Sequence, residues 1–206
     1  MKNRTETESR ILDAVTAIVL EEGMTGVGVN SIAVKADCSK VLIYRYFGGL
    51  DGLLSRWAEG NNYWIRQVGR QNLAALSGAT LELKEKITAD VFKGQLKDMR
   101  SERVMRELIR WQLSEDNPVC RAMMARAEEK GLGLTTALLE NTETNLDVEA
   151  ITALVVSGIF YLTLSSDHAP VFNGVRLDAE EGWERIEGAI EQIADMMFSR
   201  IQEKKK

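Results

Sequence analysis

Apolar residues recur at steps of three and four along most of this 206-residue chain, which is the spacing expected of helices that bury one face. The first such segment is expected to open at a capping box formed by Thr5 and Glu8 and to end at Gly23. Its inward positions are Ile11, Leu12, Val15, Ile18 and Val19.

The stretch 29–53 predicts two short amphipathic helices joined by the polar turn Asp37-Cys38-Ser39. The inward positions are Ile32, Ala33 and Ala36 on the first helix, and Ile43 and Phe47 on the second, which starts at Lys40. Two short helices joined in this way form the helix-turn-helix unit that sets a helix into the DNA major groove. With the first helix they make a bundle of about fifty residues, which is marginal alone and is expected to pack against the helices after it.

The rest of the chain continues the helical pattern. A long fourth helix is expected from Asp51 to Ser77, and further helices are expected to open at Thr80, Glu102, Asn117-Pro118 and Asp147. The last helix is expected over 179–203, opened by a capping box of Asp178 and Glu181. The segments 141–145 and 165–177 are expected to be irregular, and no alternating strand pattern competes. The predicted fold class is all-α.

Composition narrows the class of protein. No apolar run approaches the ~20 residues that span a bilayer, and the N-terminus lacks the apolar core of a signal peptide, so a cytoplasmic protein without a membrane segment is expected. Cys38 and Cys120 match no metal spacing and are interpreted as small buried hydrophobes, with a redox-sensing thiol as the less favoured alternative. We expect no metal and no cofactor.

The charge is unevenly distributed. Residues 1–56 hold seven basic and seven acidic groups, so the rest of the chain carries the whole net charge of −5. Within the second short helix and its turn, Lys40 and Arg45 are opposed only by Asp37. Affinity for phosphates depends on this local face rather than on the total. The face is weakly basic, so DNA binding would need more than one copy of it.

Several separated landmarks then fall into one order: a first helix ending in Gly23, Ile32-Ala33, Ser39-Lys40, the run 44–47 (Tyr-Arg-Tyr-Phe), and a Gly-Gly entry into a helix with Leu53. Over about residues 5–60 this order resembles the tetracycline-repressor (TetR) family of bacterial transcriptional regulators. The rest of the chain is similar to the family only in architecture.

The resemblance implies a DNA-binding domain over 1–50, with the helix-turn-helix at about 28–47, and a helical ligand-binding and dimerisation domain over 51–206. It implies a homodimeric repressor, released from a palindromic operator in double-stranded DNA when a small-molecule inducer binds. The family's DNA-contacting positions fall on Asn30, Ser39, Lys40, Val41, Leu42, Tyr44, Arg45 and Tyr46.

Two further sets of residues come from this interpretation. The ligand-binding candidates are Trp57, Asn61, Trp64, Phe92, Met105, Trp111, Met123, Phe160 and Tyr161, for any one of which ordinary helix-bundle core is the favoured alternative. Further polar anchors are Asn62, Arg66, Arg106 and Gln112. The dimer interface, from the two last helices, is expected to use Ile151, Leu154, Val155, Gly158, Trp183, Ile186, Ile190, Ile193 and Met197.

Three positions depart from the family pattern. Gly28 stands where a capping threonine is usual, and Asp37 stands where the turn usually has glycine. Leu50 replaces a lysine that usually holds a phosphate. The alternative function is therefore a helical ligand-binding or protein-interaction dimer with weakened DNA binding.

An enzyme is the least favoured class. His168 is the only histidine, and it lies in a segment where Ser165, Ser166 and Asp167 precede it. Adjacent residues of one loop do not converge as a nucleophile, a base and an orienting acid must. We expect no catalytic residues.

Overall fold

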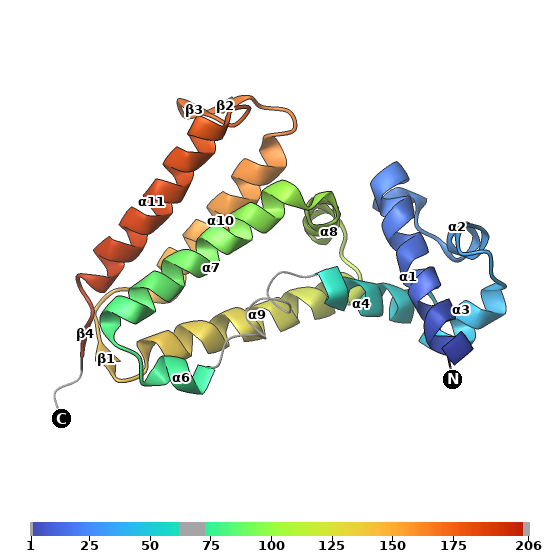
Figure 1. Cartoon of the computed structure of the whole chain (residues 1–206), viewed down its shortest axis with the longest axis horizontal. Helices are drawn as coiled ribbons and strands as arrows, with labels where there is room; N and C mark the ends of the chain where they lie inside the picture. Colours follow the sequence, from blue (N-terminus) through green and yellow to red (C-terminus); the bar gives the residue numbers. More distant parts are fainter. Residues whose placement is uncertain (1, 62–72, 204–206) are drawn as a thin grey trace. The chain divides into compact units, whose positions relative to one another are not determined.

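Figure 1 shows the computed structural model of the chain, which describes residues 2–61 and 73–203. The larger elements are α1 (Lys2–Glu22), α2 (Val29–Lys35), α3 (Lys40–Phe47), α4 (Leu50–Asn61), α6 (Leu73–Ser77), α7 (Leu81–Ser101), α8 (Arg103–Ser114), α9 (Pro118–Leu139), α10 (Val148–Ser165) and α11 (Glu180–Phe198). A 3-10 turn, η1 (Met24–Gly26), follows α1. The all-α prediction is confirmed.

The chain forms two compact units that are described separately. Unit 1 comprises residues 1–66 and 102–128, and unit 2 comprises residues 67–101 and 129–206. Unit 1 is thus larger than the predicted bundle of three helices, because α4, α8 and the first part of α9 belong to it.

The core of unit 1 explains why three helices alone do not suffice. Its buried residues include Ile11, Val15, Ile32 and Ile43 from the first three helices, as predicted. Leu53, Leu54 and Trp57 of α4, Leu108 of α8, and Val119, Cys120 and Met123 of α9 complete the same cluster. The added helices supply the apolar area that a fifty-residue bundle lacks.

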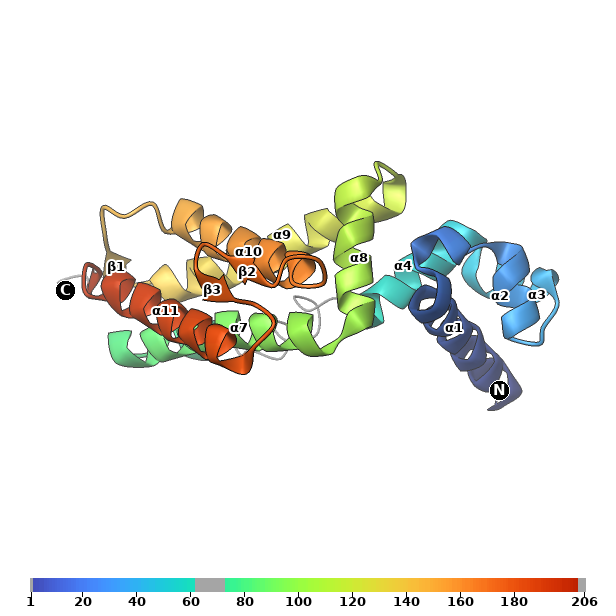
Figure 2. The ribbon, with the colours of Figure 1, turned by 90° about the horizontal axis from the view of Figure 1, so that it is seen from above.

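In unit 2, α7 packs against both α10 and α11 (Figures 1 and 2). At one end of α7 the Arg100 guanidinium donates to both carboxylate oxygens of Glu180, at 3.1 and 2.5 Å. The same guanidinium lies 4.7 Å from the ring centre of Trp183. Further along, Lys93 pairs with Glu191. These contacts hold α11 along α7.

Two short antiparallel pairs correct the expectation of irregular segments. In 165–177, β2 (Val171–Phe172) pairs with β3 (Val175–Arg176). Asn173 and Gly174 both have positive φ, 47° and 78°, as the two-residue turn of a tight hairpin requires. Near the C-terminus, β1 (Thr142–Glu143) pairs with β4 (Gln202–Glu203). For the β2–β3 pair, the sequence did contain a hairpin signal, the dipeptide Asn173-Gly174, which the prediction of an irregular segment missed.

The helix ends are partly as predicted. Asn117 caps α9, because its Oδ1 accepts from the Cys120 amide at 2.9 Å, and Asp147 caps α10 through the Ala150 amide at 2.9 Å. Gly23 ends α1 with a φ of 72°. Thr5, by contrast, lies inside α1, which starts at Lys2.

The second predicted capping box and the end of the last helix are also wrong. Ala179 precedes α11 without a side-chain cap, since Asp178 instead accepts from Arg176 at 3.1 Å. The last helix stops at Phe198 rather than at residue 203, because the chain beyond it turns to pair with β1.

Helix α10 is a longer apolar segment than the sequence analysis expected. By length and composition alone, α10 meets the requirement for a membrane span, contrary to the expectation that no segment approaches it. Little of α10 is buried within the chain. A helix that is apolar on most of its sides needs a further surface to cover it.

Candidate nucleic-acid interface

The helix-turn-helix begins with a cap that the sequence did not suggest. Gly28 precedes α2 and has no side chain to accept a bond, but its amide donates to Ser31 Oγ at 3.0 Å. The Ser31 hydroxyl in turn donates to the carbonyl of Gly26 at 2.8 Å. Ser31 therefore supplies the half of a capping box that bonds the amide of the residue before the helix.

The turn between α2 and α3 uses a left-handed residue. Asp37 has a φ of 45°, and the Cys38 amide donates to the carbonyl of Ala33 at 3.0 Å. An aspartate accepts this conformation less easily than glycine, but the buried Ala33 and Ala36 hold the end of α2 in place. Ser39 is the residue before α3, and it is exposed.

Cys38 is half-buried in this turn, and Cys120 is buried in the core of unit 1. Burial raises the pKa of both thiols above the ordinary value, although the nearby Arg10 guanidinium opposes the effect at Cys38. Both thiols are therefore protonated at neutral pH, which favours the structural interpretation over a redox role.

Helix α3 presents one face to the core and the other outward. Ile43 is fully buried and Phe47 packs against the same core. On the outward side Val41 is 69% exposed and Tyr44 is 58% exposed. Asn30, Ser39, Lys40 and Arg45 are exposed as well, whereas Leu42 and Tyr46 are half-buried. Tyr44 is therefore an outward residue and not part of the core.

A cluster of arginine and tyrosine side chains extends this face. The guanidinium carbon of Arg45 lies 4.8 Å from the ring centre of Tyr46, and Arg45 Nη2 donates to the Tyr46 hydroxyl at 2.8 Å. From α1, Arg4 lies 5.1 Å from the centre of the same ring. Sequence patterns do not point to Arg4, because only the fold brings the start of α1 beside α3.

The glycines after α3 are needed for different reasons. Gly48 and Gly49 have positive φ values of 78° and 125°, which turn the chain sharply into α4. Gly52 lies so close to α3 that a Cβ there would stand 1.9 Å from the carbonyl oxygen of Phe47. Leu50, one of the three departures from the resembled pattern, is half-buried and packs against the core.

Local ion pairing reduces the charge available to a polyanion. The Lys35 ammonium group bonds Glu21 at 2.6 Å, and Arg4 Nε donates to Glu8 at 2.7 Å. Lys40 and Arg45 remain the basic side chains of α3 itself. The face is therefore modestly basic and rich in tyrosine, as the sequence predicted.

The ligand-binding candidates fall in both units. Trp57 is buried in the core of unit 1, where its Nε1 donates to Thr16 Oγ1 at 3.0 Å, and Met105, Trp111 and Met123 belong to unit 1 as well. Phe92, Phe160 and Tyr161 belong to unit 2. Trp64, Asn62 and Arg66 lie outside the described residues.

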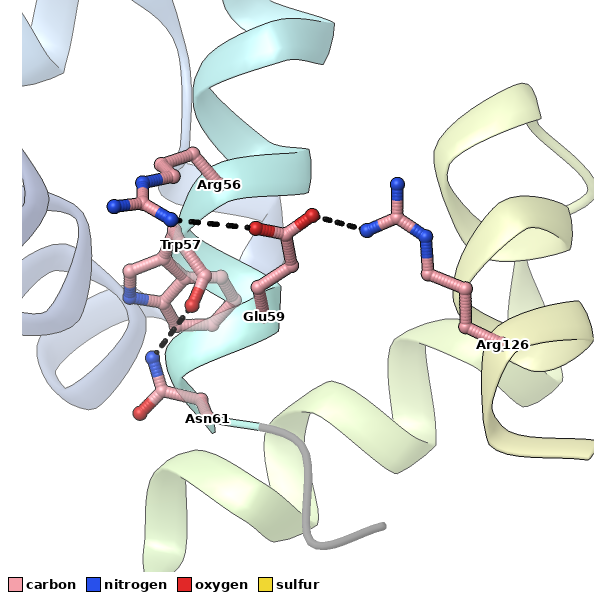
Figure 3. Close-up of polar contacts among 5 residues, drawn as sticks. All are labelled: Arg56, Trp57, Glu59, Asn61 and Arg126. Carbon is pink, nitrogen blue, oxygen red and sulfur yellow. Dashed lines mark hydrogen bonds and ion pairs between the residues drawn. The ribbon is translucent and has the colours of Figure 1, made fainter. Parts of the chain in front are cut away.

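Figure 3 shows how the end of α4 is held within unit 1. Asn61 Nδ2 donates to the carbonyl of Trp57 at 2.9 Å, so its amide nitrogen closes the last turn of α4. Glu59 lies between two arginines and pairs with Arg56 of α4 and with Arg126 of α9. The Glu59–Arg126 pair links α4 to α9, whereas the Arg56–Glu59 pair lies within α4.

The predicted dimer residues also divide into two groups. Trp183, Ile190 and Met197 of α11 are each 4% exposed in a single chain, so they pack inside the subunit. Ile151 and Ile193 pack against a core cluster of the same unit. Leu154, in contrast, is 74% exposed, and Val155, Gly158 and Ile186 are half-buried.

Unit 2 also carries an open depression of about 480 Å³ between α6 and α9. Its lining residues are Ser77, Glu129, Leu132, Gly133, Thr136, Ala137 and Glu140, none of which belongs to the predicted ligand set. His168 follows α10 in an exposed position, and its amide donates to the carbonyl of Ser165 at 2.9 Å.

Comparison with known proteins agrees with this geometry. Residues 11–56 match the family model of bacterial regulatory proteins of the tetR family. No curated protein matches the chain by sequence. The chain is similar in fold to NalD of Pseudomonas aeruginosa, the secondary repressor of the MexAB-OprM multidrug efflux pump, with 15% identity, 97% of each chain covered and a TM-score of 0.62.

Two further solved structures show the same fold. A TetR transcriptional regulator from Agrobacterium tumefaciens is 16% identical, covers 96% of this chain and 95% of its own, and has a TM-score of 0.61. GusR of Salmonella enterica is 14% identical, covers 94% of this chain and 96% of its own, and also has a TM-score of 0.61. The chain therefore carries a segment that matches the tetR family of bacterial regulatory proteins over residues 11–56, and as a whole it shares the fold of these regulators of known structure.

Proposed function

We propose that this protein is a homodimeric repressor that binds a palindromic operator and is released from it by a small molecule. The observation that carries the proposal is α3, where a fully buried Ile43 fixes a helix whose opposite side exposes Lys40, Val41, Tyr44 and Arg45. A short helix anchored on one face and polar-aromatic on the other is suited to the major groove.

The side chains of this face divide by chemistry. Lys40 and the hydroxyls of Tyr44 and Tyr46 are donors for phosphate oxygens, which fix the register on the duplex. The Tyr46 hydroxyl accepts from Arg45, so its own proton remains available for a phosphate. Val41 and Leu42 cannot hydrogen-bond and are suited to thymine methyl groups, while Asn30 and Ser39 flank the groove-facing tip.

Arg4 adds a guanidinium group from outside the helix-turn-helix, although its ion pair with Glu8 reduces the charge that it contributes. It stacks on Tyr46 from α1, and its side chain is largely exposed. We infer that it contributes a phosphate contact, which offsets the loss of the family's usual lysine at Leu50.

The exposed side of α10 supports dimerisation. Ala150, Ala153, Leu154, Ser157 and Tyr161 are all exposed and recur at helical steps, so they form one stripe along the helix. A second copy of the chain would cover this stripe as an isologous interface. Two α3 helices held by such a dimer would lie about 34–36 Å apart, one turn of DNA. This doubling also compensates for the modest charge of a single face.

Release by an effector would act through chain connections that the structure defines. A single residue, Glu102, joins α7 of unit 2 to α8 of unit 1. Within unit 1, α8 packs against α1, η1 and α4. A small molecule that binds one conformation of unit 2 better than another would raise the population of that conformation. Through the connection to α8 this change would alter the conformations of unit 1 and its affinity for the operator. Such a regulator would act in the cytoplasm, where bacterial DNA lies.

In vitro selection from random duplex DNA tests the proposal. The wild-type chain is expected to enrich a palindrome with half-sites one helical turn apart, and Arg45→Ala is expected to weaken binding by about tenfold or more. Lys130→Ala, an exposed basic position on α9, is the matched control and should bind as the wild type does. Enrichment of no sequence, or equal loss in both variants, would contradict the proposal.

Leu50 favours the second candidate, a ligand-binding or protein-interaction dimer with weakened DNA binding. Its test is Leu50→Lys, which should raise the slope of log affinity against log salt by about 0.9 if one phosphate contact is restored. Under this alternative the wild-type protein shows no specific DNA binding and the variant gains it. Under the repressor proposal the wild type already binds.

A further inference from the structure

Among the described residues of unit 2, one buried side chain has polar atoms without partners. Gln95 of α7 is fully buried, and neither its Nε2 nor its Oε1 has a hydrogen-bond partner in the part of the chain that the structure describes. Burial of an unpaired amide opposes folding, whereas an apolar residue of the same size carries no such penalty. The stability of unit 2 therefore does not explain why a glutamine is present at this buried position.

The other buried polar side chains of unit 2 are the internal comparison. Thr88 Oγ1 donates to the carbonyl of Lys84 at 2.9 Å, and Thr163 Oγ1 donates to the carbonyl of Ile159 at 2.7 Å. Lys84 Nζ donates to the carbonyl of Glu140 at 2.8 Å, and Thr142 Oγ1 to that of Leu139 at 2.6 Å. Each of these four groups bonds a main-chain carbonyl, so Gln95 differs from all of them.

The buried neighbours of Gln95 on α7 are apolar, and the nearest charged residue on the same side of the helix is the half-buried Asp98. Phe92, Leu96 and Met99 lie within about one turn of it and are buried. Thioether and aromatic side chains adapt to the shape of a guest molecule. An apolar site with one convergent polar group is typical of a pocket for a small molecule.

We propose that Gln95 is the polar anchor of the effector site and that the effector is an uncharged molecule. This inference rests on the proposed function for the role of the effector, but not for the presence of the site. A glutamine amide offers two donors and one acceptor, so it pairs best with a group that both donates and accepts, such as a carboxamide.

Among the described residues, no cation of α7 is placed to pair with an anionic ligand beside Gln95, and this disfavours an anionic ligand there. The buried Lys84 lies eleven residues before Gln95, or about 16 Å along the axis. Lys93 and Lys97 are each two residues away, on the other side of the helix, where Lys93 pairs with Glu191 and Lys97 is exposed. Lys86 is exposed, and Arg100 pairs with Glu180. A carboxylate beside the buried amide would therefore lack a partner cation from α7, which is costly. A neutral ligand avoids that cost.

Thermal unfolding of the full chain tests the stability half of the inference. Gln95→Met removes the unpaired amide at similar volume and should raise the Tm of the ligand-free protein by about 2–6 °C. The control, Thr163→Val, removes a hydroxyl that is already bonded and should not raise Tm. A Tm for Gln95→Met that is equal to or below that of the wild type would overturn the inference, because the amide would then have a partner in solution.

Benzamide and benzoate test the ligand class, since they have similar shapes but differ in charge and in donors. At about 10 mM, benzamide should raise the Tm of the wild type and of Thr163→Val but not of Gln95→Met, and benzoate should raise none of them. A larger shift with benzoate, equal shifts by benzamide in all three proteins, or no shift by benzamide in the wild type would contradict the proposal. Operator binding by the wild type is measured separately, so a failed repressor function and a failed effector site give different results.

Discussion

Replacement of Leu154 by glutamate is expected to separate the proposed dimer without unfolding the subunit. Leu154 is 74% exposed in a single chain, so the fold of the monomer gains little from it. In an isologous dimer the residue of each copy is covered, and full burial of a leucine side chain contributes about 1.5–3 kcal/mol. Two copies therefore contribute about 3–6 kcal/mol to association.

This contribution corresponds to a weakening of the dimer by about 10²- to 10⁴-fold, because about 1.4 kcal/mol is a factor of ten in affinity. A buried glutamate adds to the loss, so these figures are lower bounds. Sedimentation equilibrium at micromolar concentration should show a dimer for the wild type and a monomer for Leu154→Glu. Circular dichroism should give the same helix content for both.

Leu113→Glu is the matched control. Leu113 is also a strongly exposed leucine, but it lies on α8 of unit 1, which is not one of the proposed interface helices. The control should remain a dimer with the wild-type association constant. A dimer that persists in Leu154→Glu would refute the assignment of α10 to the interface, and a monomeric wild type would refute dimerisation itself.

Three other predictions concern the interface and the packing. Arg4→Ala should lower the slope of log operator affinity against log salt by about 0.9 when binding is measured by fluorescence anisotropy. The control Arg176→Ala, in unit 2, should leave the slope unchanged. Equal slopes for Arg4→Ala and the wild type would exclude the phosphate contact. Gly52→Ala places a Cβ 1.9 Å from the Phe47 carbonyl oxygen and should destabilise unit 1 by about 1–3 kcal/mol in urea unfolding, whereas Gly78→Ala, which meets nothing within 4 Å, should have little effect. Arg100 lowers the pKa of Glu180, so the stabilisation by this pair is present above the unfolded-state pKa and is lost as pH falls through the folded-state pKa. Glu180→Gln should therefore reduce the fall of Tm at acidic pH in a plot of Tm against pH. An unchanged fall of Tm would show that the pair contributes nothing to stability.

The helix-turn-helix could be predicted closely because its signals are local. The spacing of Ile32, Ala36 and Ile43 determines which face is buried, and all three are buried as predicted. The caps at Asn117 and Asp147 depend on a side chain that reaches three residues ahead, and they were predicted correctly. Patterns of this kind are predictable because the residues that make each contact are close together in the sequence.

The residues that the sequence could not assign or missed depend on contacts between distant segments. Trp183, Ile190 and Met197 form a seam, but periodicity does not distinguish a seam against α7 of the same chain from one against a partner. Arg4 reaches Tyr46 only after α1 and α3 have packed together. Gln95 is unusual only because the other buried polar groups described in unit 2 have partners, which no spacing rule reveals.

Operator binding as a function of salt tests the central claim most directly. The selected duplex is titrated with the purified protein between about 50 and 200 mM salt, and a scrambled duplex of equal length is the comparison. We predict two chains bound per duplex, a steep loss of affinity with salt, and a preference of about 10³-fold or more for the selected sequence. Equal affinity for both duplexes, or binding that does not respond to salt, would contradict the assignment of α3 as a DNA-reading helix.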